Sequence, residues 1–378
     1  MKPLKTLIRK NLLEIEPCVH GGDVWTPARR RGLRPEEIVD YSSSINPLGA
    51  SLTAIEAAAA SLTQTAVYPD SNSTMLREAI ANHFGGINAE NIIIGNGSTE
   101  LIYLFTEAFI QDGDLALIPQ PTFGEYAVAV KKAGGRVKPF TLPSNFKVEP
   151  DVLIHEMAGA KILFLCNPNN PTSILMSQNE VTAVIEQALD RDVLIFIDED
   201  YIEFVADEAS ASFVNKADKY ANLFVLRSFT KFHGLTGLRV GYGVAHEELV
   251  SLLSRVKMPW NVNCAAQAAA EAALRDEAHQ TRTRMLMRDE RAFLARALSK
   301  IPGFKVYPAD ANFFLINVAE TGYSAPELKE RMLDYGILIR DCSSINGLNA
   351  EYIRVAVRTH TQNMKLVEAF EKTVQRKR

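Results

Sequence analysis

Short apolar runs alternate with longer stretches of helical periodicity between about residues 50 and 260 of this chain. The helical stretches include Thr99 to Ile110 and Gln178 to Leu189, where apolar residues recur at helical spacing. Alternation of this kind predicts an α/β fold built from βαβ units around a mostly parallel sheet. The runs that we expect to form buried strands are Ile92–Ile94, Leu115–Ile118, Ile162–Cys166, Leu194–Ile197 and Leu223–Leu226.

The pattern changes after Asn263. An alanine-rich stretch leads into a long charged helical pattern from Asp276 to Lys300, and four short strand-like pieces follow. These pieces are Phe304–Tyr307, Asn312–Asn317, Ile337–Arg340 and Tyr352–Val357. We therefore predict three parts: an N-terminal arm over residues 1–48 that packs with the small domain, a large domain over 49–262, and a linker helix with a smaller α+β domain over 263–378.

Composition excludes several functional classes. The 378 residues include 41 basic and 45 acidic ones, so the net charge of -4 gives no general reason to expect a nucleic-acid partner. Four cysteines lie far apart without a CxxC pair, and the seven histidines show no metal-binding spacing. No apolar run is long enough to span a bilayer. We expect a cytoplasmic protein that binds no metal, membrane or nucleic acid.

Lys231 follows the last of the strand-like runs, and Ser228 and Arg239 lie close to it in the sequence. Open α/β sheets bind ligands beyond the carboxyl ends of their strands. A lysine amine can form a Schiff base with an aldehyde, while the hydroxyl and the guanidinium can bind an anion. This combination predicts pyridoxal phosphate as the cofactor, with Lys231 as its Schiff-base partner.

Asp198 comes directly after the predicted strand Leu194–Ile197. A carboxylate at the end of a buried strand is unfavourable unless a cation or several donors meet it. It could pair with the protonated ring nitrogen of the cofactor; a structural salt bridge or a helix N-cap is the alternative. Tyr201 lies three residues on and could bond the phenolic oxygen of the cofactor, or it could be a packed amphipathic side chain.

Three further segments follow predicted strands. In Asn167–Thr172, two prolines among asparagines predict a rigid turn that could aim Asn170 at the same phenolic oxygen. Gly95–Glu100 could expose amide groups to a phosphate, or it could be an ordinary capped turn, and it lacks the ending of a nucleotide-binding loop. Phe123 could stack on an aromatic ring or could pack in the core.

Taken together, these stretches resemble the fold-type I pyridoxal phosphate enzymes, the aspartate aminotransferase superfamily, over nearly the whole chain. The resemblance implies a large domain with a mostly parallel central sheet, a smaller α+β domain, and a homodimer. It is carried by His20–Gly22, Asp40–Gly49, Tyr68–Asp70, Gly95–Glu100, Cys166–Thr172, Ser228–Tyr242, Met258–Trp260 and Arg354–Arg358.

The resemblance also implies a role for each matching residue. Lys231 would form the Schiff base and Asp198 would meet the ring nitrogen. The other cofactor contacts would come from Asn170 and Tyr201 at the phenolic oxygen, Phe123 over the ring, and Ser98, Thr99, Ser228 and Arg239 at the phosphate. Tyr68 would reach the cofactor phosphate of the neighbouring subunit. Arg354 would pair with the α-carboxylate of the substrate.

Two residues depart from the family pattern. Ser173 stands where a glycine commonly follows the Asn-Pro-Thr turn, and Asp200 replaces a small residue that is frequent after the Asp-Glu pair. We expect neither side chain to touch the proposed catalytic atoms.

Within the family, the residues are most similar to the threonine-phosphate decarboxylases of cobalamin biosynthesis. His20, the segment around Asn46, and Arg358 with Arg340 favour that assignment, although His20 could cap a turn and Arg358 could be a surface residue. The resemblance thus implies a carboxy-lyase that converts O-phospho-L-threonine to (R)-1-aminopropan-2-ol O-phosphate and carbon dioxide. The alternatives are a histidinol-phosphate aminotransferase and, more remotely, a non-catalytic sensor.

Overall fold

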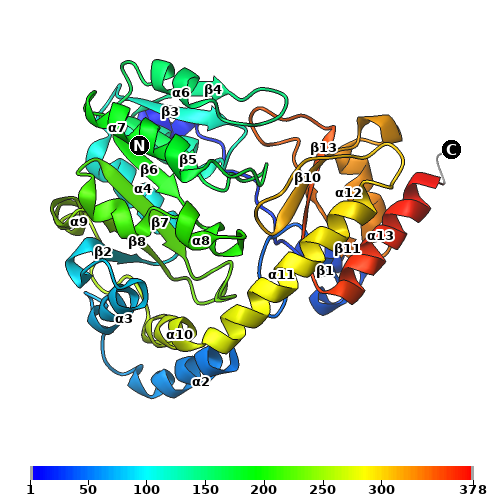
Figure 1. Ribbon diagram of the computed structural model, residues 1–378, viewed down its shortest axis with the longest axis horizontal. Coiled ribbons are helices and arrows are strands. Elements are labelled where there is room, and N and C mark those ends of the chain that lie inside the picture. Colours follow the sequence, from blue (N-terminus) through cyan, green and yellow to red (C-terminus); the bar gives the residue numbers. More distant parts are fainter. Residues whose placement is uncertain (1–2, 376–378) are drawn as a thin grey trace.

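A seven-stranded sheet forms the centre of the larger lobe in a computed structural model that describes residues 3–375 (Figure 1). The strand order is β2-β8-β7-β6-β5-β3-β4, and the pairs from β7 to β4 are parallel. Only β8 runs antiparallel to both of its neighbours. The strands are β2 (Ile92–Gly95), β3 (Leu115–Gln120), β4 (Arg136–Thr141), β5 (Ile162–Cys166), β6 (Leu194–Asp198), β7 (Leu223–Ser228) and β8 (Gly241–Ala245).

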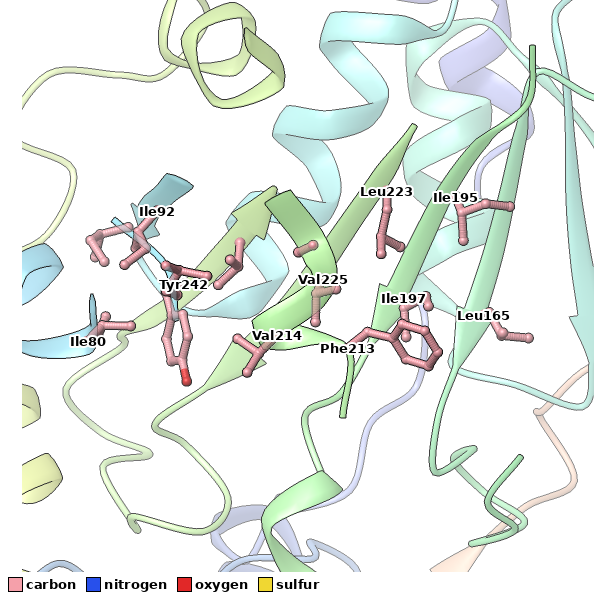
Figure 2. Close-up of a cluster of buried hydrophobic side chains, with 14 of the residues drawn as sticks. Ile80, Ile92, Leu165, Ile195, Ile197, Phe213, Val214, Leu223, Val225 and Tyr242 are labelled. Carbon is pink, nitrogen blue, oxygen red and sulfur yellow. The ribbon is translucent and has the colours of Figure 1, made fainter. Parts of the chain in front are cut away.

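Helices cover both faces of this sheet because its strands are apolar on both sides. Successive residues of β6 belong to opposite cores: Ile195 and Ile197 pack with Phe213 (Figure 2), whereas Phe196 packs with Phe105 on the other face. The helices of this lobe are α2 (Leu52–Ser61), α3 (Thr74–Phe84), α4 (Ser98–Phe109), α5 (Glu125–Ala133), α6 (Pro150–Glu156), α7 (Gln178–Leu189), α8 (Glu208–Ala211), α9 (Glu247–Ser254) and α10 (Cys264–Arg275).

A four-stranded antiparallel sheet of order β12-β13-β10-β9 forms the second lobe, and three helices pack beside it (Figure 1). Its strands are β9 (Lys305–Val306), β10 (Phe313–Asn317), β12 (Arg340–Asp341) and β13 (Tyr352–Ala356), and its helices are α11 (Glu277–Leu298), α12 (Ala325–Leu333) and α13 (His360–Gln375). α11 extends from beside α10 to this lobe. Within residues 3–375, no helix is both long and apolar enough to cross a membrane.

The N-terminal segment touches both lobes. β1 (Val39–Asp40) pairs in parallel with β11 (Ile337–Leu338), and α1 (Trp25–Arg31) contributes Ala28 to a small core shared with Leu333. Residues nearer the N-terminus lie instead against α5, where the Asn11 amide donates a 2.8 Å hydrogen bond to the Lys131 carbonyl. The segment therefore contacts both lobes. The boundaries of the three predicted parts stay a prediction, and residues 1–2 and 376–378 lie outside the described residues.

Candidate active site

The carboxyl ends of five strands share one edge of the large sheet. β3, β5, β6 and β7 are mutually parallel, and β2 points the same way because β8 is antiparallel to both β2 and β7. The edge therefore collects the residues that follow each strand. These include the predicted groups Ser98 and Thr99 after β2, Phe123 after β3, Asn170 after β5, Asp198 and Tyr201 at the end of β6, and Ser228 and Lys231 at the end of β7.

Lys231 is held through its backbone by Asn46. The Asn46 amide N–H donates to the Lys231 carbonyl at 3.0 Å, and the Asn46 side chain donates to the Phe232 carbonyl at 2.8 Å and to Thr283 Oγ1 at 2.9 Å. Because its backbone N–H and its side-chain amide donate to these oxygens, Asn46 supports the backbone at Lys231 and Phe232. The contact with the substrate that the resemblance implies for Asn46 stays a prediction. Lys231 Nζ lies 5.6 Å from the centre of the Tyr201 ring.

Asp198 is buried and accepts two hydrogen bonds. The Tyr126 hydroxyl donates to Oδ2 at 2.5 Å, and the Asp200 backbone N–H donates to Oδ1 at 2.9 Å. Burial, and then the neighbouring Asp200 carboxylate, raise the pKa of Asp198 to about 8, while the Tyr126 bond opposes this rise. A cationic ring nitrogen would supply the counter-charge that this carboxylate lacks. Sequence reasoning missed Tyr126, although it follows Phe123 by three residues in the same short segment.

The residues predicted at the phosphate are packed closely around two glycines. A Cβ on Gly97 would lie 2.4 Å from Arg239 Nη2, and one on Gly241 would lie 2.6 Å from the Ser98 amide nitrogen. Gly97 also has a φ of 80°, which favours glycine. These glycines let a guanidinium and backbone N–H groups approach one spot, together with Ser228, whose Oγ accepts a 3.0 Å bond from the Thr230 amide. This donor set fits a phosphate group.

Two arginines lie side by side in the small sheet. Arg340 of β12 and Arg354 of β13 are direct partners in the antiparallel register, so their side chains are on the same face. Both are buried, and burial, followed by the charge of Arg354, lowers the pKa of Arg340. Arg354 donates to Asn170 Oδ1 and, at 2.7 Å, to the Ser42 carbonyl, which brings it to the cofactor edge of the large sheet. Its Nε is buried and has no partner among the described residues.

The N-terminal segment crosses this region. His20 Nε2 lies 2.7 Å from Glu125 Oε1, and this bond is the main reason why the pKa of Glu125 is lowered. The His20 ring centre lies 5.8 Å from that of Phe123, while the carbonyl of Val19 accepts a 2.7 Å bond from Arg340. His20 is thus close to the predicted ring-covering residue, and Glu125 is a partner that sequence reasoning did not find.

The two remaining predicted residues, Tyr68 and Arg358, have other neighbours. Tyr68 is 77% exposed and stacks on Trp260, with ring centres 4.4 Å apart. Arg358 lies just beyond β13, and burial lowers its pKa while Tyr41 and Asp40 are the groups that oppose this. The Nε atom of Arg358 is buried and has no hydrogen-bond partner among the described residues.

We expected the Asp200 side chain not to touch the proposed catalytic atoms, and its hydrogen bond is to Ser98, a residue predicted at the phosphate. The Asp200 backbone bonds Asp198, and its carboxylate Oδ2 accepts a 3.0 Å bond from the Ser98 hydroxyl. Asp200 therefore touches two of the residues proposed for the cofactor. Ser173 has a φ of 64°, in the region that favours glycine, and its hydroxyl accepts a 2.9 Å bond from the Ala311 amide of the small lobe.

Comparison with known proteins assigns the class. Residues 36–370 match the family described as aminotransferase class I and II. The chain belongs to this family, its fold is that of the fold-type I enzymes as predicted, and pyridoxal phosphate is its cofactor. The cradle around Ser98 and the carboxylate of Asp198 fit that cofactor.

Individual relatives are similar over nearly the full chain. The histidinol-phosphate aminotransferase of Methanosarcina mazei is 35% identical over 97% of this chain and 96% of its own length. The crystal structure of the enzyme of the same name from Clostridium acetobutylicum has a TM-score of 0.83 and 30% identity, and the match covers 89% of this chain and 99% of that one. The structure of L-threonine-O-3-phosphate decarboxylase from Porphyromonas gingivalis has a TM-score of 0.80 and 26% identity, with 89% and 100% covered.

These findings overturn our expectation of a threonine-phosphate decarboxylase. Curated relatives at 32–35% identity over the whole chain are histidinol-phosphate aminotransferases. The expectation rested on His20, Asn46 and Arg358. In the structure Asn46 supports Lys231, and His20 bonds Glu125.

Proposed function

We propose that the protein transfers an amino group from a phosphorylated amino alcohol, histidinol phosphate, to an oxo acid. The observation that carries this proposal is the buried pair of Arg340 and Arg354, which are register partners at the cofactor edge. The names of the full-length relatives point to the same substrate.

The arginine pair favours a dianionic ligand. Two buried like charges repel each other, and no carboxylate of the described residues lies within 4.0 Å of either guanidinium. A phosphate monoester has two negative charges and enough oxygens to accept from both groups, whereas a neutral substrate would leave the repulsion in place. In the second half of the reaction, Arg354 could bind the carboxylate of the oxo acid. This agrees with our prediction that Arg354 pairs with a substrate carboxylate.

Bound pyridoxal phosphate supplies an aldehyde that takes up the amino group and a ring that withdraws electrons from it. Lys231 would move the proton from the substrate carbon, and Asp198 would hold the ring nitrogen in its protonated form. Asn170 and Tyr201 would bond the phenolic oxygen, and Phe123 would cover the ring. These assignments are proposals that follow from the shared position of the residues at one sheet edge.

We also propose a homodimer in which Tyr68 reaches the neighbouring active site. Large apolar side chains are exposed between residues 52 and 75 and near Trp260, whose ring stacks on Tyr68: Leu52, Ile55, Leu62, Val67, Met75, Met258 and Trp260. Such a cluster is favourable only when another surface covers it, and a second copy of the chain would do so. A cytoplasmic location remains a prediction from the sequence.

The function is tested with purified protein, pyridoxal phosphate, histidinol phosphate and 2-oxoglutarate. We expect glutamate to form, and Lys231→Ala to abolish its formation while the protein still folds. Histidinol without the phosphate serves as the matched substrate, and we expect its kcat/KM to be at least about 100-fold lower because the arginine pair has no dianion to bind. Equal rates with both substrates would contradict the phosphate-binding role.

A further inference from the structure

Asp200 connects the two ends of the proposed cofactor site. It lies two residues beyond β6, and its side chain is buried. Its backbone N–H bonds Asp198, which is proposed at the ring nitrogen, and its Oδ2 is bonded to Ser98, which is proposed at the phosphate. The second carboxyl oxygen, Oδ1, is buried without a partner among the described residues. A negative charge on Asp200 is therefore only half compensated by hydrogen bonds.

The groups that face Asp200 come from several elements around it. The acidic or polar ones are Asp198 of β6, Cys166 of β5, and Tyr201 and Glu203 beside β6; the cations are Arg227 of β7, and Lys231 and Arg239 between β7 and β8. Arg227 is already paired with three glutamates, and Arg239 would pair with the phosphate. A bound phosphate would thus add negative charge beside Asp200 and occupy one of its cations. Burial already raises the pKa of Asp200, against the opposing charge of Lys231.

The protonation state of Asp200 decides what Ser98 can offer to a ligand. When Asp200 is ionised, it accepts the single hydroxyl hydrogen of Ser98, and the Ser98 oxygen can then present only lone pairs to an anion. When Asp200 carries a proton on Oδ2, it donates to Ser98 Oγ instead. The Ser98 hydroxyl hydrogen is then free to bond a phosphate oxygen. The 3.0 Å separation is compatible with either direction.

We infer that Asp200 is a positioning residue for the cofactor phosphate, acting in its neutral form by donating a hydrogen bond to Ser98, which in turn donates to the phosphate. The inference rests on the proposed placement of the phosphate at Ser98, and it holds for any amino-group donor. The two neighbouring acids then have different roles. Asp198 keeps a negative charge opposite the ring nitrogen, and Asp200 keeps a proton on the side of the phosphate.

The test measures the dissociation constant of pyridoxal phosphate for the full-length protein at pH 7.5, by dialysis and the visible absorbance of the bound cofactor. Asp200→Asn supplies an amide that donates to Ser98, so we expect its dissociation constant to stay within about threefold of the parent. Asp200→Ala removes the donor, and we expect binding to weaken about fivefold, the effect of one net hydrogen bond. With Ser98→Ala present as well, both substitutions should change binding less than about twofold.

Several outcomes would overturn the inference. If Asp200 is ionised beside the phosphate, both Asp200 substitutions should tighten cofactor binding. If its role is only structural, Asp200→Ala should weaken binding equally with and without the Ser98 hydroxyl. Glu203→Gln is the matched control: this acid is also buried near Asp200, but it pairs with Arg227 and, within the described residues, has no hydrogen bond to Ser98. Its substitution should leave the dissociation constant within about twofold.

A spectroscopic measurement tests the proton directly. The infrared difference spectrum between the parent holoenzyme and Asp200→Asn should contain the carbonyl stretch of a neutral carboxyl group, and its absence would also overturn the inference. As pH rises, cofactor affinity of the parent should fall relative to Asp200→Asn, because binding requires the proton that Asp200 then loses. These measurements use no amino-group donor, so failure of the histidinol phosphate assay leaves them unaffected.

Discussion

Arg227 and the Arg340–Arg354 pair are both buried arginine sites, but their surroundings are opposite. Arg227 is fully buried and lies within 3.1 Å of carboxylate oxygens of Glu199, Glu203 and Glu208. Within the described residues, Arg340 and Arg354 bond only carbonyl, amide and hydroxyl oxygens. Arg227 thus has its counter-charges within the folded chain, whereas the Arg340–Arg354 pair has none among the described residues. A buried cation with internal counter-charges stabilises the structure, and a buried cation pair without them is suited to an anionic ligand.

The strongest test of this difference is Arg227→Met. It leaves three carboxylates without their shared cation, so we expect the free energy of unfolding to fall by about 3–5 kcal/mol, measured by urea denaturation. Arg284→Met is the control, because Arg284 is partly exposed and its salt bridge within the described residues is to Glu208 alone. We expect a loss below about 1 kcal/mol there. A small loss for Arg227→Met would show that this site resembles the ligand-binding pair after all.

Arg354→Lys should give the reverse result. Lysine lacks the planar guanidinium group, which can donate two parallel hydrogen bonds to a phosphate. We therefore expect kcat/KM for histidinol phosphate to fall about 100-fold, equivalent to about 3 kcal/mol of transition-state binding. The free energy of unfolding should change by less than about 1 kcal/mol, because no internal ion pair is broken. The loss should be much smaller with unphosphorylated histidinol. Loss of stability with unchanged kinetics would make Arg354 a structural residue.

A third test measures how the free energy of unfolding depends on pH through Glu203, one of the three glutamates that pair with Arg227. Burial raises the pKa of Glu203 to about 8, so between pH 5 and 8 the folded protein holds a proton that the unfolded chain has released. Stability from this proton is present at low pH and is lost as pH rises towards 8. Glu203→Gln should remove about 1–2 kcal/mol of that decline. Asp207→Asn, at an exposed helix cap, should leave the slope unchanged; an unchanged slope for Glu203→Gln itself would place the titration elsewhere.

Asp198 is a third kind of buried charge, held by hydrogen-bond donors. Tyr126→Phe removes one donor, so the pKa of Asp198 should rise further and its hold on the ring nitrogen should weaken. We expect kcat for amino transfer to fall about fivefold, or ~1 kcal/mol. Tyr103→Phe is the control, since its hydroxyl bonds Glu125 instead. A visible absorbance of the bound cofactor that changes with pH as in the parent would contradict this role for Tyr126.

The central strands β3, β5, β6 and β7 could be predicted from the sequence because burial on both faces makes them continuously apolar. β4 and β8 could not. β4 is an edge strand with a largely exposed pattern, and β8 contains Gly241 and Gly243, where the Ser98 amide and the Phe224 ring leave no room for a side chain. These glycines reflect neighbours that are distant in the sequence, so local patterns give no strand signal there.

The candidate site shows the same division. Lys231 and Asp198 could be predicted because each follows an apolar run, and strand ends meet at one edge. The position of Asn46 depends on Thr283, 237 residues away, and its side chain could not be assigned from local sequence. The pairing of Arg340 with Arg354 across β12 and β13, on which our proposal for the substrate rests, joins residues 14 positions apart and cannot be read from a motif.

The pairing of β1 with β11 has a consequence for the synthesis of the chain. Val39 and Ile337 are partners, so the N-terminal segment has no native strand to join until almost the whole chain has been made. At about 5–20 residues per second, that interval is about 15–60 s. During this time the chain can complete the large sheet, whose strands all lie before residue 246. The cofactor edge can therefore be built on the ribosome, while the join between the lobes is among the last contacts to form.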